Sequence, residues 1–270
     1  MKTQIAGIKI DALSKKDAIS EINKFLISEN AHLITTIYSE FIVFAKQNLK
    51  FKQVLNNSDL ALTDGIGIAW ADYFLTQTKS KNKILAFCNL LASLFKTAIN
   101  PKSVFKNIPE KISGSELVWD IVRLASENKN SICLYGGTNG VAKKTAEKLK
   151  ERYSDIIINL AQSDKKFDEQ AVNEIKQSKS DILLIAYSPP MQEIWLSDNL
   201  QNFGVKLAIG LGGTFDYIAG KRAYRPNFFN SRGLEWLWRL FTQPYRIKRM
   251  WNALPVFIWQ IYKAKINQVK

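Results

Sequence analysis

Two aspartates that stand near glycines are the residues best suited to acid–base chemistry. Asp64 directly precedes Gly65, and Asp216 follows Gly212 and Gly213 by a few residues. Glycine lets a ligand approach the backbone closely, and a carboxylate at such a place can take a proton from a sugar hydroxyl as a general base. An aspartate that caps the next helix gives the same pattern. The spacing alone therefore leaves both interpretations open.

Two further polar residues, Gln192 and Glu193, open the helix expected after Pro190. Proline suits a first helical turn, so both side chains project near the end of the preceding strand. Their amide and carboxylate can hydrogen-bond a polar ligand, but Gln and Glu are also ordinary first-turn residues. These two interpretations also stay open.

Histidine and cysteine chemistry has little support in the sequence. The only histidine, His32, opens an expected strand, where a lone histidine is usually structural. Cys88 and Cys133 lie in apolar runs, so we expect two buried free thiols and a reducing compartment. No Cys/His cluster has metal-ligand spacing, and no DxD-like pair of carboxylates stands at an expected strand end. Carboxylates could still bind a metal, but we predict no metal site.

The elements that must position these residues alternate between short apolar strands and amphipathic helices. We expect strands at Gln4–Ile10, His32–Thr36, Leu60–Thr63, Ser131–Tyr135, Asp155–Leu160, Asp181–Ala186 and Val205–Ile209. The helical patterns include Lys16–Ile27, Ser115–Ser126, Val141–Arg152 and Met191–Gln201. This alternation predicts an α/β fold with a largely parallel sheet and helices on both faces.

Ligands of such folds bind at the carboxyl ends of the strands. The expected strand ends carry Asp64 and two glycine-rich turns, Gly136–Gly140 and Gly210–Gly213. Neither turn has the spacing of a dinucleotide fingerprint or a P-loop. The glycines by themselves are equally typical of tight turns.

Charge is distributed unevenly along the chain. The 270 residues carry a formal net charge of +14, with 46% hydrophobic and 23% charged residues, which excludes extensive disorder. Residues 221–270 contain eleven Lys and Arg, one acid and four of the seven tryptophans, and hold +10 of the charge. This balance suits an acidic substrate, a nucleic acid or an anionic membrane.

Membrane contact, if present, is expected to be peripheral. No apolar run reaches the ~20 residues of a spanning helix, and residues 1–10 lack the apolar core of a signal peptide. We therefore expect a cytoplasmic protein. Residues 76–107 break the strand–helix rhythm, because the apolar run Ile84–Phe95 is flanked by lysines. That pattern is typical of a basic amphipathic helix on a membrane surface and equally of a core or lid helix.

Seven motifs occur in order along nearly the whole chain. They are Thr36–Glu40, Asp64–Gly67, Glu110–Gly114, Gly136–Ala142, Pro190–Asn199, Gly212–Gly220, and Gly233–Leu240 with Pro244, Arg246 and Arg249 after it. Together, and above all through the unusual Gly-Leu-Glu-Trp run at 233–236, they make the chain resemble the WecG/TagA/CpsF family of bacterial glycosyltransferases.

The resemblance implies a Rossmann-like core over residues 1–225, with 76–107 as an insertion. Residues 226–270 become a helical, basic appendage that docks on the membrane and closes the active site. The implied reaction is an inverting, metal-independent transfer of N-acetylmannosamine, or a related hexose or uronic acid, from a UDP-sugar to a sugar on a polyprenyl pyrophosphate. It serves synthesis of cell-surface polysaccharide or teichoic acid. No cofactor and no nucleic acid is implied, and a homo-oligomer stays open.

Residue roles also follow from the resemblance. Asp64 is implied to be the general base on the acceptor hydroxyl, while Thr36 and Gln192 line the sugar pocket. Arg239, Arg246 and Arg249 are implied to fold over the site and neutralise the departing diphosphate. The implied substrate-binding residues are Tyr38, Gly65, Lys111, Gly136, Gly137, Glu193, Gly212, Gly213 and Asp216.

Tyr38 and Lys111 depart from the family pattern, which has Asn and Arg at these positions. Both fall near the expected sugar site, so they bear on the identity of the donor sugar and on activity. Two alternatives to an active glycosyltransferase follow. One is a catalytically silent homologue that binds a UDP-sugar without transferring it. The other is a nucleic-acid-binding protein, suggested by the basic and aromatic stretch at the C-terminus.

Overall fold

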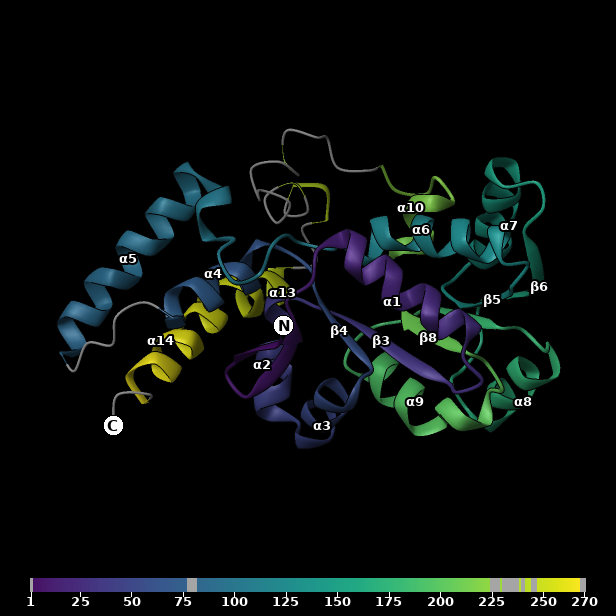
Figure 1. Ribbon diagram of the computed structural model, residues 1–270, viewed down its shortest axis with the longest axis horizontal. Helices are drawn as coiled ribbons and strands as arrows, with labels where there is room; N and C mark the ends of the chain where they lie inside the picture. The colour runs from purple at the N-terminus through teal and green to yellow at the C-terminus, as the bar shows by residue number, and fades with distance from the viewer. Residues whose placement is uncertain are drawn as a thin grey trace.

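A computed structural model describes residues 2–76, 82–223, 229, 238, 241–243 and 247–267. A sheet lies at the centre, with helices on both sides and a further group of helices at one end (Figure 1). The predicted residues Arg239 and Arg246 lie outside the described residues.

The sheet has six strands in the order β4-β3-β8-β7-β5-β6. Their bounds are β3 (His32–Ile37), β4 (Leu60–Thr63), β5 (Ser131–Gly136), β6 (Ile157–Gln162), β7 (Ile182–Ala186) and β8 (Leu207–Gly210). Every pairing in this sheet is parallel, so all six carboxyl ends lie along one edge. The predicted parallel α/β core is therefore confirmed.

Side chains alternate between two apolar cores, one on each face of the sheet, because successive strand residues point to opposite faces. Leu184 belongs to the first core and its neighbour Leu183 to the second. The first core is covered by α1 (Lys15–Ile27), α6 (Gly114–Glu127), α7 (Val141–Arg152) and α10 (Thr214–Ile218). The second is covered by α2 (Ser39–Gln47), α3 (Leu49–Asn57), α8 (Glu169–Gln177) and α9 (Met191–Asn199).

The N-terminal segment is a β-hairpin, and the prediction of one continuous strand over Gln4–Ile10 is wrong. β1 (Lys2–Ile5) pairs antiparallel with β2 (Ile8–Asp11) in a separate two-stranded sheet. Ala6 and Gly7 form the turn, with φ of 49° and 84°. The buried residues Ile5 and Ile8 stand three positions apart, so the period of two is broken at this turn.

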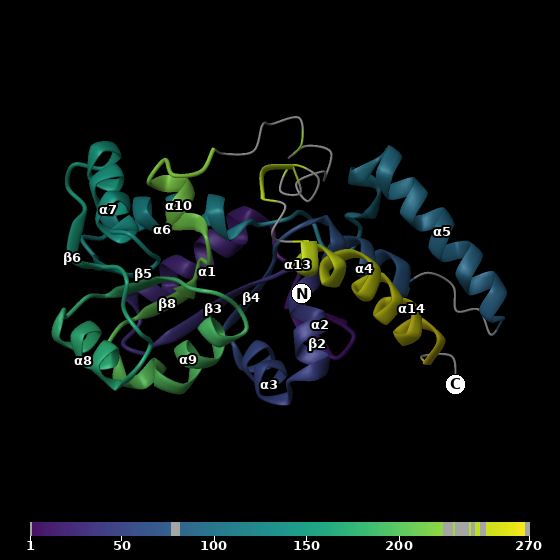
Figure 2. The same cartoon turned by 180° about the vertical axis from the view of Figure 1, so that it is seen from behind.

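Helices from both halves of the chain meet at one end of the molecule. They are α4 (Ile66–Thr76), α5 (Lys83–Ile99), α13 (Ile247–Trp251), a π-helical turn (Asn252–Val256) and α14 (Phe257–Asn267). Figure 2 shows α14 alongside α4, with α5 outermost. Lys265 is buried and donates from Nζ to the carbonyls of Phe74 and Leu75, both at 3.0 Å. Because these carbonyls end α4, Lys265 caps that helix.

The insertion at 76–107 is helical through α5 and a short 3-10 helix, Pro101–Val104. Cys133 is buried as predicted, but Cys88 is exposed, because α5 turns that position to solvent. None of the helices within the described ranges is both long and apolar enough to cross a membrane.

Candidate active site at the carboxyl ends of the strands

Asp64 is the first residue after β4 and lies beside β3. Its N–H donates to the Ile37 carbonyl at 2.8 Å, which extends the parallel register and sets Asp64 next to Tyr38. Gly65 follows with φ of 97°, a left-handed conformation that favours glycine, and the chain turns there into α4. A half-buried carboxylate at the sheet edge is suited to general-base chemistry.

Thr36 and Lys111 border the same position. The N–H of Ile112 donates to the Thr63 carbonyl at 2.7 Å, so the segment that holds Lys111 runs beside the end of β4. α6 begins at Gly114, where a Cβ would lie 3.2 Å from Thr36 Oγ1. Glycine therefore lets the helix start close to Thr36, whose side chain is buried. The structure places Thr36, Asp64 and Lys111 at the same end of β3 and β4.

Arg249 reaches this place from the C-terminal helix α13. Its Nε donates to both carboxylate oxygens of Glu40, at 3.2 and 3.0 Å, and one terminal nitrogen donates to Glu40 Oε2 and to the Tyr38 hydroxyl, both at 2.8 Å. Glu40 is 2% exposed, whereas the Arg249 side chain is 36% exposed. Burial by itself lowers the pKa of Arg249, but Tyr38 and Glu40 outweigh it and raise that pKa. The guanidinium is thus a permanent cation held by a buried acid.

We call Thr36, Tyr38, Glu40, Asp64, Lys111 and Arg249 the charged end of the site. Glu40 is its one member that was not predicted. The sequence signal was an acid in the first turn of a helix inside the Thr36–Glu40 motif, which is equally typical of an ordinary capping residue. Its partner is 209 residues away in the chain, so spacing could not reveal the pair.

Gly136 and Gly137 form a tight turn after β5, with φ of 100° and 71°. The N–H of Gly137 donates to the Ala186 carbonyl at 2.7 Å, and a Cβ on Gly136 would lie 2.5 Å from that same oxygen. Only glycine fits here, because any side chain would push β5 and β7 apart. The Asp164 carboxylate accepts the N–H groups of Asn139 and Gly140 and so fixes the rest of the turn.

Gly212 and Gly213 form a second turn after β8 and lead into α10. Asp216, in the first turn of that helix, forms an ion pair with Arg222 at 3.2 Å. Arg222 also lies 3.4 Å from where a Cβ on Gly213 would be. Lys221 donates to the carbonyls of Thr138 and Asn139 in the first turn, at 2.8 and 3.1 Å. Two cations therefore lie at the two glycine turns.

Gln192 holds the ends of β7 and β8 together. Its Oε1 accepts from the N–H groups of Tyr187 at 2.9 Å and Gly212 at 3.1 Å. A side chain at Gly210 would collide with the Gln192 amide. Gln192 is 3% exposed, so the structure gives it a positioning role at the sheet edge. We call Gly136, Gly137, Gly212, Gly213, Asp216 and Gln192 the glycine end of the site.

Glu193 lies between the two ends. It is 3% exposed and accepts from Gln192 Nε2 at 2.7 Å through Oε1, while Oε2 has no hydrogen-bond partner among the described residues. Burial raises its pKa to about 7, although the Gln192 hydrogen bond and the charge of Arg249 oppose the rise. Because Arg249 acts on Glu193, the charged end and the glycine end share one electrostatic environment.

The two ends meet where β3 lies next to β8. A Cβ at Gly114 would contact Thr36 on one side and the Leu211 side chain, at 3.7 Å, on the other. The edge therefore offers a carboxylate for proton transfer, cations for a phosphate, and close backbone approach between them.

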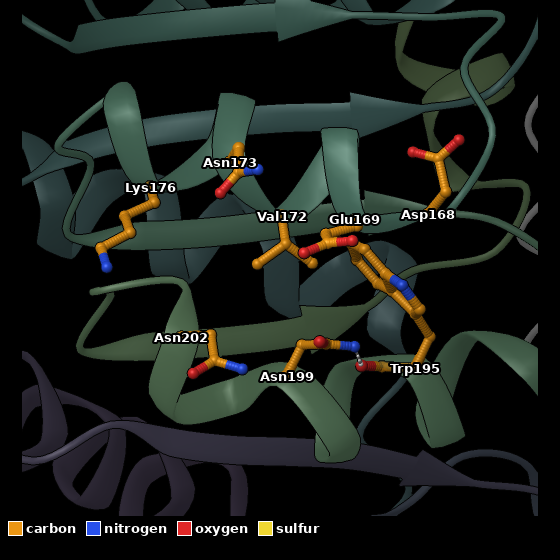
Figure 3. Close-up of a pocket in the computed structure, with 8 residues that line it drawn as sticks. All are labelled: Asp168, Glu169, Val172, Asn173, Lys176, Trp195, Asn199 and Asn202. Carbon is orange, nitrogen blue, oxygen red and sulfur yellow. Dashed lines mark hydrogen bonds between the residues drawn. The ribbon is translucent and has the colours of Figure 1, made fainter.

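A separate pocket lies on the outer face between α8 and α9 (Figure 3). It has a volume of about 530 Å³ and is lined by Asp168, Glu169, Val172, Asn173, Lys176, Trp195, Asn199 and Asn202. Asn199 Nδ2 donates to the Trp195 carbonyl at its floor, at 3.0 Å. None of the predicted site residues lines this pocket.

Comparisons with known proteins identify the family of this chain. The model of the glycosyl transferase WecG/TagA/CpsF family matches residues 3–106 and 102–270. Two curated relatives, from Staphylococcus aureus strains MRSA252 and NCTC 8325 / PS 47, are each 24% identical over 273 residues. The match covers 98% of this chain and 93% of each relative. Both relatives are named N-acetylglucosaminyldiphosphoundecaprenol N-acetyl-beta-D-mannosaminyltransferase. With a family match over nearly its whole length, the chain belongs to the WecG/TagA/CpsF family of glycosyltransferases.

Proposed function

We propose that this enzyme transfers an N-acetylmannosaminyl residue, or a related hexose or uronic acid, from a UDP-sugar to N-acetylglucosamine on a polyprenyl diphosphate. The product then serves synthesis of a cell-surface polysaccharide or teichoic acid. The names of the relatives support the acceptor and the transferred sugar. The single observation that carries the proposal is the position of Asp64, at the same sheet edge as two glycine turns and their cations.

In the proposed step, the acceptor hydroxyl attacks the anomeric carbon from the face opposite UDP. Asp64 takes the hydroxyl proton while the new C–O bond forms and the bond from the anomeric carbon to the UDP oxygen breaks. UDP leaves with that electron pair, and the configuration at the anomeric carbon is inverted. Thr36, Tyr38 and Lys111 border Asp64 and are proposed to orient the reacting sugars.

The leaving diphosphate needs positive charge in the transition state. We assign it to the glycine end, where Lys221 and Arg222 are supported by described contacts. Arg239 and Arg246, which lie outside the described residues, are proposed to add further charge when the segment over 226–270 closes the site. In this proposal the reaction requires no bound metal and no cofactor, because arginine and lysine side chains supply the cations.

A polyprenyl acceptor is anchored in a bilayer, so the enzyme must work at a membrane surface. The basic, tryptophan-containing C-terminal segment supports peripheral docking at the cytoplasmic face. Trp251 and Trp259 on α13 and α14 are 65% and 51% exposed, as such docking requires.

The test is to incubate the protein with a panel of UDP-sugars and a short-chain lipid-diphosphate N-acetylglucosamine, and to identify products by mass. We expect one product heavier by an N-acetylhexosamine residue or a related sugar, formed equally with and without EDTA. Proton NMR of the new linkage should show the inverted anomer. UDP-sugar binding without any product would instead indicate a silent homologue, and loss of product in EDTA would overturn metal independence.

A further inference from the structure

Helix α5 exposes an apolar face to solvent. Its inner side, with Ala86, Leu90 and Ser93 buried, packs on α4. The large outward side chains are 44–76% exposed, and they are Ile84, Leu85, Phe87, Leu91, Phe95 and Ile99, which we call the α5 face. At 100° per residue, these positions fall in one arc opposite the buried side. A contiguous apolar surface of this kind marks an interaction site on a soluble protein.

Lysines surround the α5 face. Lys83 and Lys96 stand at its two edges, and Lys102 and Lys106 follow the helix, all four being exposed. Lys96 and Lys106 lie over the Tyr73 ring, at 5.1 and 5.7 Å from its centroid. No Asp or Glu occurs between residues 82 and 109. The charge at the border of the apolar face is therefore of one sign only.

This charge pattern distinguishes between two kinds of partner. Two copies of the chain joined through their α5 faces would bring lysines together with no acid beside them, and that repulsion disfavours a dimer. An anionic bilayer offers an apolar interior to the face and phosphates to the lysines. We propose that α5 lies in the plane of an anionic phospholipid bilayer, with the α5 face buried below the headgroups.

This inference deepens the proposed function and rests on it, because a lipid-linked acceptor is what brings the site to a bilayer. α4 starts two residues after Asp64, and the indole N–H of Trp70 in α4 donates to Ser93 Oγ in α5 at 3.0 Å. Helix α14 lies at the same end of the molecule as α5 (Figure 1). It carries the exposed Trp259, whose ring centroid is 5.1 Å from the Lys263 ammonium. Helix α4 thus begins near Asp64 and packs on α5, which carries the proposed bilayer contact.

Vesicle co-sedimentation without nucleotide or acceptor tests the proposal. We expect wild type to bind vesicles of phosphatidylcholine with 30 mol% phosphatidylglycerol. Leu91→Gln/Phe95→Gln should bind at least about tenfold more weakly, because two large apolar side chains no longer enter the lipid. The matched control, Ile27→Gln/Leu49→Gln, changes side chains that are 68% and 75% exposed on α1 and α3 and should bind as wild type does. Equal binding by both double variants would overturn the proposal.

Cys88 gives a second measurement, because it is exposed within the α5 arc while Cys133 is buried and does not compete for label. An environment-sensitive fluorophore on Cys88 should shift to the blue and resist iodide quenching when vesicles are added. An unchanged emission from vesicle-bound protein would overturn insertion. A shift that grows with protein concentration without lipid, with a dimer mass in light scattering, would assign the face to a second copy instead. Transfer to a short-chain, water-soluble acceptor should survive Leu91→Gln/Phe95→Gln, so a failed docking test leaves the proposed reaction standing.

Discussion

The charged end and the glycine end lie on one sheet edge but are built from different parts of the chain. At the charged end, side-chain contacts define the structure: Arg249 pairs with Glu40 near Asp64, which is the proposed general base. At the glycine end, close backbone packing defines the structure, because Gly136 and Gly137 lie against the Ala186 carbonyl and leave no room for a side chain. We therefore expect the charged end to lose function when a side-chain group is removed. We expect the glycine end to lose stability when a side chain is added.

The sharpest test of this difference is at Asp64. Asp64→Asn keeps the shape of the side chain and removes the base, so we expect the transfer rate to fall by roughly 10²–10⁴-fold with UDP affinity unchanged. Product formation measured by mass and UDP binding measured by calorimetry check both parts. Asp155→Asn, an exposed carboxylate before β6, is the matched control and should keep full activity. Equal rates for Asp64→Asn and wild type would remove Asp64 from the role of base.

The second prediction concerns the pKa of Glu193, the buried acid between the two ends. Its pKa of about 7 lies above the ordinary 4.5, so between these pH values the folded protein holds a proton that the unfolded chain has lost. The free energy of unfolding should therefore fall as pH rises through this window, by about 3 kcal/mol in total. Glu193→Gln does not titrate and should lack that fall.

Urea unfolding of wild type and Glu193→Gln at pH 5, 6, 7 and 8 measures the effect. We expect the variant to gain stability relative to wild type at each step up to about pH 7 and to gain nothing further above it. Parallel pH profiles for the two proteins would show that Glu193 is ionised throughout and that burial does not raise its pKa.

The next prediction compares two costs of adding a side chain at the glycine end: the steric clash of the new Cβ and the strain of a positive φ. Gly136 and Gly140 both have positive φ, of 100° and 69°, but a Cβ at Gly136 would meet a carbonyl while one at Gly140 would meet nothing within 4 Å. We expect Gly140→Ala to cost about 1 kcal/mol in unfolding free energy and Gly136→Ala roughly 3 kcal/mol. Gly136→Ala should also weaken UDP binding. Equal costs would mean that the turn yields freely and that close packing does not define this end.

Much of this arrangement could be predicted, because parallel strands with apolar, β-branched residues place their exits along one edge. Asp64, Gly136 and Gly212 were found in this way from the residues directly after each run. Gln192 was also found, but its role could not be, since its two partners, Tyr187 and Gly212, depend on how β7 and β8 pair. Local sequence patterns locate the end of a strand, but the pairing of strands in the folded sheet decides which groups the side chains at that end contact.

Other features depend on long-range packing and left no local signal. The prediction that Arg249 faces a diphosphate stays a prediction, and the sequence did not reveal its contacts with Glu40 and Tyr38. Cys88 lies in a mostly apolar run with large apolar side chains on both the exposed and the buried face of α5, so the sequence did not show which face is exposed. The contacts of Arg249 and the exposure of Cys88 both depend on which elements pack beside them, and those elements are far away in the sequence.

The smallest expected effect compares one ion pair from each end. Arg249–Glu40 and Arg222–Asp216 have similarly exposed arginines, at 36% and 34%, but the acids differ, at 2% and 21% exposed. A buried acid depends more on its partner, so we expect a coupling energy of about 1.5 kcal/mol for the first pair and about 0.5 kcal/mol for the second. Double-mutant cycles with Arg→Met and acid→amide substitutions, read by urea unfolding, measure both. Coupling that is equal, or larger at Arg222, would mean that the glycine end depends on side-chain charge as much as the charged end does, and the distinction between them would fail.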